Sequence, residues 1–412
     1  MATDAFGRLR VSNPSNIFDY FPSALTGSAT PPLDVDQWVN TTSGTGAIAY
    51  DSTYNYVKLT CSANSDIATV SSKLPMTYQP GKSRLIYMTS IPLSRVNSGS
   101  ETLSFKIGIF SLSGNNPQEG HYFETNGTSL YWVYCYGGTP TQVIQSSWNI
   151  DTFDGTGPSG LTLTASNTTK NMLFVIDQEW LGVGRVRVGF NLNGVNYYAH
   201  QFIPNLTYAY TTTPLLPLSY QLSATSIGSS IFSGKICATC VSEGGYTPLG
   251  TKIAVGTSIA GVNVSDSGTK YVILGLKIGS SFPTGIIKIL GLDMLYPGGS
   301  TTKWATIELQ LHSTNGSIGA LSSTPSFTQV SHSITQLYTG PSSGTAISVT
   351  TDGYILTRHN ILQSEQIYFN SSEYDTLLTR MQLSKYDTLY IVGTANTANQ
   401  TIIASLEFIE KS

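Results

Sequence analysis

Short stretches in which apolar and polar residues alternate recur along the chain, and this period of two restricts its fold more than any other feature. Tyr56–Thr60, Leu103–Ile107 and Arg185–Phe190 each follow the alternation, which on a β-strand places one set of side chains in a core and the other in solvent. Continuous apolar runs at Met172–Ile176 and Tyr271–Leu274 are typical of strands that are covered on both faces. The pattern therefore predicts a chain built from strands.

Turn signals separate these stretches at short intervals. Leu192-Asn193-Gly194-Val195 predicts a two-residue hairpin that joins Val186–Phe190 to Val195–Ala199. The segment closest to helical spacing is Ser371–Ser384, and no long helix is expected. Many strands with regular turns predict an all-β fold made of sandwiches.

Composition shifts divide the chain into three parts. Residues 1–30 have no sustained periodicity, so we expect an extended N-terminal arm. Residues 31–245 predict a first β-sandwich domain, rich in tyrosine and tryptophan, and residues 246–412 predict a second one that is poorer in aromatic residues. Both domains are expected to be jelly-roll-like. The glycine- and proline-containing stretch at 243–250 predicts the boundary between them.

Charge and cysteine content exclude several classes of protein. Only 11% of the 412 residues are charged and the net charge is −3, so neither nucleic acid nor a membrane is expected as a partner. The sequence contains no run of about 18 apolar residues, so no transmembrane helix is expected. The start of the sequence lacks the layout of a signal peptide, so we expect synthesis in a cytoplasm. Four cysteines in a chain of this length do not predict a disulfide framework.

Two glycine motifs begin like nucleotide-binding signatures but fail on spacing. Gly81–Ser83 lacks the earlier glycine of a P-loop, because Met76 stands at that position, and a turn leading into a strand is expected instead. Gly182–Gly184 is followed by Arg187 where a dinucleotide fingerprint has its third glycine. Arg185 and Arg187 share one face of a strand, which is either solvated or in contact with carboxylates of a neighbouring chain.

No metal or other cofactor is expected. Cys237 and Cys240 form a lone C-x-x-C pair, whereas a structural zinc site needs four ligands. We expect two small buried side chains on opposite faces of a strand. Asp151 and Asp154, in a turn-dense segment, offer oxygen atoms to Ca²⁺. Hydrogen bonding within turns explains the same two residues, and both interpretations stay open.

The sequence does not predict an enzyme. Its five histidines are scattered and no G-x-S-x-G nucleophile motif is present. The enzymatic alternative is a capsule depolymerase, which would need a cleft with two carboxylates about 5–10 Å apart.

The N-terminal string Asp4–Ser12 (DAFGRLRVS), followed by Ile17–Asp19, resembles the start of a family of virion structural proteins found in tailed bacteriophages and some large DNA viruses. Further strings match in order up to about residue 250: YQPGKS at 78–83, SWNID at 147–151, DGTGPSG at 154–160, WLGVGRVRVG at 180–189 and SEGGY at 242–246. The resemblance implies a virion component without fixing its position. We expect it in the tail, collar or capsid surface of a virion that is assembled in the host cytoplasm. It carries over no catalytic residue.

The predicted arm gives this virion component a means of attachment. Its apolar residues would anchor it to neighbouring subunits, and its charged residues would form charge-assisted hydrogen bonds. Docking of the arm on its own domain is the alternative. The expected contact residues are Asp4, Phe6, Arg8, Leu9, Arg10, Val11 and Phe18. The expected partners are other virion proteins and copies of the chain itself, in a homo-oligomer.

The alternative function is an adhesin that binds a host surface glycan. Tyr131–Tyr136, which contains three tyrosines and a tryptophan, is the candidate platform for stacking a sugar. The competing interpretation places its alternate aromatic residues in the core of the first domain.

Overall fold

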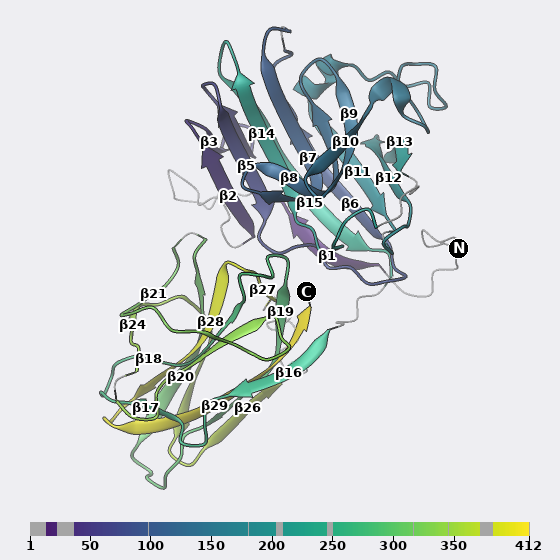
Figure 1. Cartoon of the computed structure of the whole chain (residues 1–412). Helices are drawn as coiled ribbons and strands as arrows, with labels where there is room; N and C mark the ends of the chain where they lie inside the picture. The colour runs from purple at the N-terminus through teal and green to yellow at the C-terminus, as the bar shows by residue number, and fades with distance from the viewer. Residues whose placement is uncertain are drawn as a thin grey trace. The chain divides into compact units, whose positions relative to one another are not determined.

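The computed structural model describes residues 14–22, 37–97, 99–179, 181–202, 209–244, 250–315, 317–344, 346–370 and 382–411. It divides the chain into two compact units, residues 1–247 and 248–412, which are drawn in Figure 1. Six of the predicted arm contacts, Asp4, Phe6, Arg8, Leu9, Arg10 and Val11, lie outside the described residues. Within those residues, no helix has the length and apolar character needed to span a membrane.

The described residues of unit 1 form fifteen strands and two short 3-10 helices. Their bounds are β1 Ser15–Tyr20, β2 Trp38–Ser43, β3 Ala47–Asp51, β4 Tyr56–Cys61, β5 Asp66–Ser72, β6 Arg84–Ile91, β7 Thr102–Ser113, β8 Asn116–Thr125, β9 Leu130–Tyr136, β10 Thr139–Ile144, η1 Gln145–Ser147, η2 Ala165–Thr169, β11 Met172–Gln178, β12 Val186–Leu192, β13 Val195–Phe202, β14 Leu218–Ser226 and β15 Ile231–Ser242.

These strands form two antiparallel sheets. The first has the order β13-β12-β11-β6-β15-β4-β3, with β1 also paired to β15, and the second has the order β10-β9-β8-β7-β14-β5-β2. The chain repeatedly crosses from one sheet to the other, as between β4 and β5, β5 and β6, and β6 and β7. This topology is that of a jelly-roll-like sandwich, and the predicted all-β fold is confirmed.

Aromatic rings fill the space between the two sheets of unit 1. Phe174 and Phe190 of the first sheet meet Phe123 and Trp132 of the second, with ring centroids 5.0 Å apart for Phe123–Phe174 and 5.7 Å apart for Trp132–Phe190. The tilted arrangement of both pairs is favoured by the ring quadrupoles and adds to the free energy of burying their area. The core therefore lies where the period of two places the inward-facing side chains.

The first described strand, β1, belongs to the sandwich of its own chain. It pairs with β15, where Phe18 lies opposite Cys240. The rings of Phe18 and Tyr20 pack edge-on against Trp38, with centroid distances of 5.4 and 5.1 Å. Phe18, which was expected to contact a neighbouring subunit, therefore packs against its own chain in this strand. A strand of six residues is too short for its periodicity to show that it pairs with a strand far along the sequence.

The hairpin between β12 and β13 has the predicted form. Asn193 and Gly194 both have positive φ angles, 54° and 82°, as a type I′ turn requires. The segment with helical spacing at Ser371–Ser384 lies mostly outside the described residues. Its described part includes a short strand, Gln382–Leu383.

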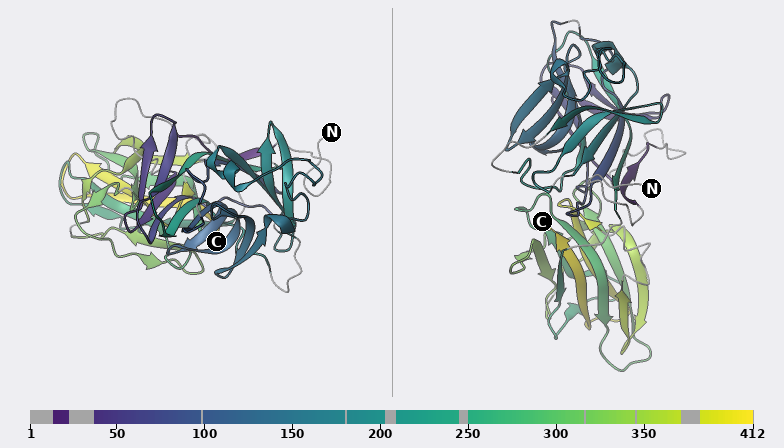
Figure 2. Two further views of the ribbon diagram at one scale, coloured as in Figure 1. Left: turned by 90° about the horizontal axis from the view of Figure 1, so that it is seen from above. Right: turned by 90° about the vertical axis from the view of Figure 1, so that its right-hand side faces the viewer.

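Unit 2 is a second sandwich, made mainly of two six-stranded sheets (Figure 2). The bounds of its strands are β16 Thr251–Gly256, β17 Val262–Val264, β18 Tyr271–Ile278, β19 Ile286–Leu295, β20 Trp304–Ser313, β21 Ala320–Leu321, β22 Thr328–Gln329, β23 Thr335–Thr339, β24 Val349–Thr351, β25 Tyr354–Leu362, β26 Gln366–Asn370, β27 Gln382–Leu383, β28 Asp387–Ala395 and β29 Gln400–Lys411.

One sheet of unit 2 has the order β16-β29-β19-β26, with β17 and β27 paired at its sides, and the other has the order β22-β23-β18-β28-β20-β25. Leu406 and Phe408 of β29 are buried in the same cluster as Leu309 of β20 and Ile391 of β28. This core is aliphatic for the most part, in agreement with the lower aromatic content of the second half of the sequence.

Candidate functional site

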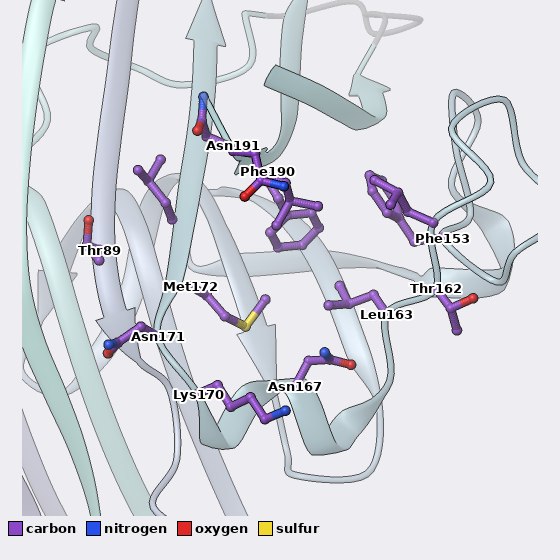
Figure 3. Close-up of a pocket in the computed structure, with 14 residues that line it drawn as sticks. Thr89, Phe153, Thr162, Leu163, Asn167, Lys170, Asn171, Met172, Phe190 and Asn191 are labelled. Atoms are coloured by element: carbon purple, nitrogen blue, oxygen red, sulfur yellow. The ribbon is translucent and has the colours of Figure 1, made fainter. Parts of the chain in front are cut away.

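A pocket of about 310 Å³ lies at one end of the first sheet of unit 1 (Figure 3). The start of β11, the end of β12, the 3-10 helix η2 and the loop that precedes η2 all contribute to its wall. Pockets that bind small molecules have volumes from about 300 Å³ upward. The space is therefore suited to one small ligand, or to one ring of a longer ligand.

The floor of the pocket is apolar. Leu161 and Leu163 come from the loop before η2, Met172 begins β11, and Phe153 and Phe190 reach the pocket from the core. The rings of Phe153 and Phe190 pack edge-to-face with their centroids 5.5 Å apart. Because both rings are fixed in the core of the sandwich, the floor is rigid before any ligand arrives.

Hydrogen bonds hold the loop that supplies half of this floor. The Leu163 amide donates to the Phe153 carbonyl at 2.7 Å. The side-chain amide of Gln145 donates to the carbonyls of Thr152 and Leu163, at 2.9 Å in each case. The loop is thus fastened at both of its ends.

Asp151 and Asp154 have a structural role in the same loop. The Asp151 carboxylate accepts the backbone N–H groups of Phe153 and Ser159, both at 2.8 Å. Burial acts to raise the pKa of Asp151, but these hydrogen bonds outweigh it and lower the pKa. Asp154 accepts the backbone N–H and the hydroxyl of Thr156. No cluster of three or more His, Cys, Asp or Glu residues that could hold a metal ion is found in the described ranges, and turn hydrogen bonding accounts for both aspartates.

Polar side chains surround the apolar floor. Asn167 and Lys170 lie together on one side of the pocket and Asn191 lies opposite (Figure 3). Asn191 is fixed by a 2.6 Å hydrogen bond to Asn196, whereas Asn171 makes no side-chain hydrogen bond to any described residue. The Oδ1 atom of Asn167 accepts hydrogen bonds from Thr164, and its Nδ2 atom has no partner among the described groups. The rim therefore offers donors that the fold itself does not use.

The competing interpretation of Tyr131–Tyr136, which places its alternate aromatic residues in the core, holds for Trp132 and Tyr134. Trp132 is fully buried between the sheets. The ring of Tyr134 packs against Phe202 and Tyr210, with centroid distances of 5.7 and 6.2 Å. Tyr131 lies on the other face of β9, half-buried against a separate cluster that contains Tyr122 and Val133. The aromatic residues of β9 are thus divided between its two faces, and Trp132 and Tyr134 do not present a flat surface to a sugar.

Arg187 of β12 and Arg185, which directly precedes β12, both form ion pairs within the chain. Arg187 forms an ion pair with Asp177, which lies directly opposite it on β11. Arg185 forms an ion pair with Glu179, the residue that follows β11. Carboxylates of the same chain therefore pair with both arginines, whose side chains remain 32% and 27% exposed for Arg185 and Arg187. The antiparallel register of β11 and β12 supplies the partners, and that register was not evident from the sequence.

The C-x-x-C pair also differs from its prediction. Cys240 is buried, and its burial raises the pKa of its thiol to about 12. Cys237 is exposed, because the register of β15 shifts between Lys235 and Ala238. The strand predicted after the Gly81–Ser83 turn is confirmed, since β6 begins directly after it.

A second pocket, of about 580 Å³, lies in unit 2 and is lined by Thr251, Phe282, His332 and Glu410 among others. Glu410 is the one carboxylate among its described lining residues. It accepts hydrogen bonds from the Ser333 hydroxyl at 2.5 Å and the Thr335 hydroxyl at 2.9 Å. Those bonds hold one oxygen atom of the carboxylate, and no second described carboxylate faces it. The pocket of unit 1 combines an apolar floor with amide donors at its rim, and it is the candidate binding site.

No family model and no curated protein matches the sequence. Similar solved structures include a legume lectin-like domain from Entamoeba histolytica, with 9% identity, a TM-score of 0.31 and coverage of 49% of this chain and 89% of that one. An endo-1,3-beta-glucanase from Streptomyces sioyaensis has 10% identity, a TM-score of 0.36 and coverage of 57% and 99%. The CBM2 module of the evolved Dit protein of Lactobacillus casei BL23 phage J-1 has 7% identity, a TM-score of 0.33 and coverage of 58% and 100%. Similarity at this level supports no inference about a ligand or an activity.

Proposed function

We propose that the chain is a virion structural protein whose first unit binds carbohydrate in the pocket of Figure 3. The observation that carries the carbohydrate proposal is the combination of a rigid apolar floor with a rim of unused amide donors. Asn167 and Asn171 supply two of those donors, and Leu163 and Met172 belong to the floor.

The chemistry of a sugar ring matches this combination. Its C–H groups form apolar faces that gain free energy when they leave water, at about 25 cal/mol per Å² of buried area. Its hydroxyl groups both donate and accept hydrogen bonds, as carboxamide side chains do. Because the floor is fixed by the core and by the bonds of Gln145, little ordering of the protein opposes binding.

Binding of glycans by the full chain to an array tests this proposal. We expect the wild-type chain to bind a subset of the glycans and Asn171→Ala to weaken binding about two- to tenfold, as the loss of one hydrogen bond predicts. Asn171→Trp, which places an indole ring at the opening, should abolish binding. Asn116→Ala is the matched control, since Asn116 is an exposed asparagine of β8 that does not line the pocket. The proposal would be refuted if the wild-type chain bound no glycan, or if both Asn171 variants bound glycans as strongly as the wild type.

The virion role is supported by the resemblance of Asp4–Ser12 to the start of a virion protein family. Because Phe18 packs on Trp38 of its own chain, the proposed tether to other virion proteins is limited to the segment from Asp4 to Val11. Deletion of residues 1–13 leaves β1 in place, and we expect it to reduce incorporation of the chain into particles. Unchanged incorporation would contradict the tether.

A further inference from the structure

We infer that the saccharide bound in the pocket of unit 1 is anionic, and that Lys170 binds its carboxylate or sulfate group. This inference rests on the proposed carbohydrate function and specifies its ligand class. Lys170 lines the pocket together with Asn167 and Asn171, and Figure 3 shows its side chain beside that of Asn167.

Lys170 differs from the other basic residues of unit 1. Arg95, Lys106, Arg185 and Arg187 form ion pairs with carboxylates, Arg84 donates to carbonyl groups, Lys58 and Lys235 lie over aromatic rings, and Lys73 and Lys82 have partners as well. Among the lysines and arginines that the structure describes in unit 1, Lys170 alone has no ion pair, hydrogen bond or ring contact through its side chain. Its positive charge is therefore not used by the fold.

The electrostatics of the pocket favour an anion. Lys170 is the one charged residue among the described residues that line it, and no aspartate or glutamate is among them. The nearby loop carries Asp151 and Asp154, but their oxygens accept hydrogen bonds from Phe153, Ser159 and Thr156. A ligand with a negative group thus meets a positive side chain that no lining carboxylate neutralises.

The neighbouring amide of Asn167 completes a site for an oxyanion. The backbone N–H of Lys170 donates to the Asn167 carbonyl at 3.0 Å, and the side chains of these two residues lie beside one another (Figure 3). The Lys170 ammonium group and the amide nitrogen of Asn167 can both donate to the oxygens of a carboxylate or sulfate. Hydrogen bonds between charged groups are roughly twice as strong as those between neutral groups, so the negative group should be recognised in preference to a hydroxyl.

Matched pairs of saccharides test the inference by titration calorimetry of the full chain. The probes are sialyllactose against lactose, tetragalacturonate against its carboxyl-reduced form, and 3′-sulfated lactose against lactose. We expect at least one anionic probe to bind about tenfold more tightly than its neutral counterpart, a difference of about 1.4 kcal/mol. A preference for the carboxylated or the sulfated probe identifies which negative group the site takes.

Lys170→Gln should remove this preference by lowering the affinity for the anionic probe about tenfold, to that of its neutral counterpart. Lys58→Gln is the matched control, because Lys58 lies over the Phe232 ring and does not line the pocket, and it should keep the preference. Equal affinity for neutral and anionic probes, with no effect of Lys170→Gln, would overturn the anionic ligand but not the carbohydrate function. Failure of every probe and of the glycan array would overturn both.

Discussion

Replacement of Tyr20 by alanine tests whether β1 belongs to the sandwich of its own chain. Tyr20 is only 8% exposed. Its ring packs edge-on against Trp38 with a centroid distance of 5.1 Å, and the Lys235 ammonium lies 3.9 Å from the centre of the ring. The substitution removes these contacts but keeps the main-chain pairing of residue 20 with Ala238.

The expected loss of stability can be worked out from these contacts. A buried aromatic side chain covers about 150 Å² or more, which corresponds to roughly 4 kcal/mol at about 25 cal/mol per Å². Part of the Tyr20 area is kept by the alanine methyl group. The Lys235 ammonium also keeps its contact with Trp38, at 3.5 Å from that ring centre. We therefore expect the free energy of unfolding of unit 1 to fall by about 3 kcal/mol, at the lower end of the range for removing a buried aromatic residue.

Urea unfolding of the full chain, followed by tryptophan fluorescence, measures this loss because Trp38 reports on the contact. With a urea dependence of about 3 kcal/mol per M, the midpoint of the unit 1 transition should fall by about 1 M. Phe21→Ala is the matched control, since Phe21 follows directly and is 68% exposed, and its effect should be below about 0.5 kcal/mol. If Tyr20→Ala were no more destabilising than Phe21→Ala, β1 would not be docked on its own chain, and it would be available to a neighbouring subunit.

Two further predictions concern titration and thiol chemistry. Hydrogen bonds from Thr45 and from the backbone of the chain after Cys61 hold the pKa of Asp66 at about 2, below the ~3.9 of an unfolded chain. The stability that this difference contributes is therefore present above about pH 4 and is lost as the pH falls toward 2. The melting temperature should fall between pH 4 and pH 2.5 less steeply in Asp66→Asn than in the wild type, and equal slopes would contradict the assignment. Since Cys237 is exposed and the other three thiols are buried, a maleimide should label one site in the native chain and four after denaturation. Cys237→Ser should abolish the native labelling, and labelling that persists would show that a buried thiol is accessible.

The parts of the fold that follow from local sequence could be predicted. Alternation places Val186, Val188 and Phe190 in the core because a strand presents every second residue to the same face. The Asn193-Gly194 turn could also be predicted, since its backbone geometry depends on only two residues. In both cases the residues that determine the structure lie within a few positions of the structure that they form.

Features that depend on pairing between distant segments could not be predicted. The partner of Phe18 on β15 lies more than 200 residues along the chain. The exposure of Cys237 results from a register shift that only the neighbouring strand reveals, and the same holds for the ion pair of Arg187 with Asp177.

The candidate site was missed for the same reason. Its residues come from a loop, a 3-10 helix and the ends of two strands, and no fixed spacing connects them. The one local signal was Asn167–Asn171, a polar segment with an unpaired lysine directly before the apolar strand β11. A polar segment with a lysine directly before a strand could have suggested a binding site at this end of the sheet.

The position of β1 has a consequence for the order of events during synthesis. Its hydrogen-bond partner Thr239 is 221 residues further along the chain, so the ribosome makes nearly all of unit 1 before β15 emerges. Until then Phe18 and Tyr20 have no β15 backbone to pair with, and Trp38 has no covering strand on that side. Closing such a long loop is slow, which makes the docking of β1 a late step. A nascent chain that stalls before residue 231 would therefore expose an unpaired aromatic segment, and chaperones that recognise such segments would have their longest opportunity to bind at this stage.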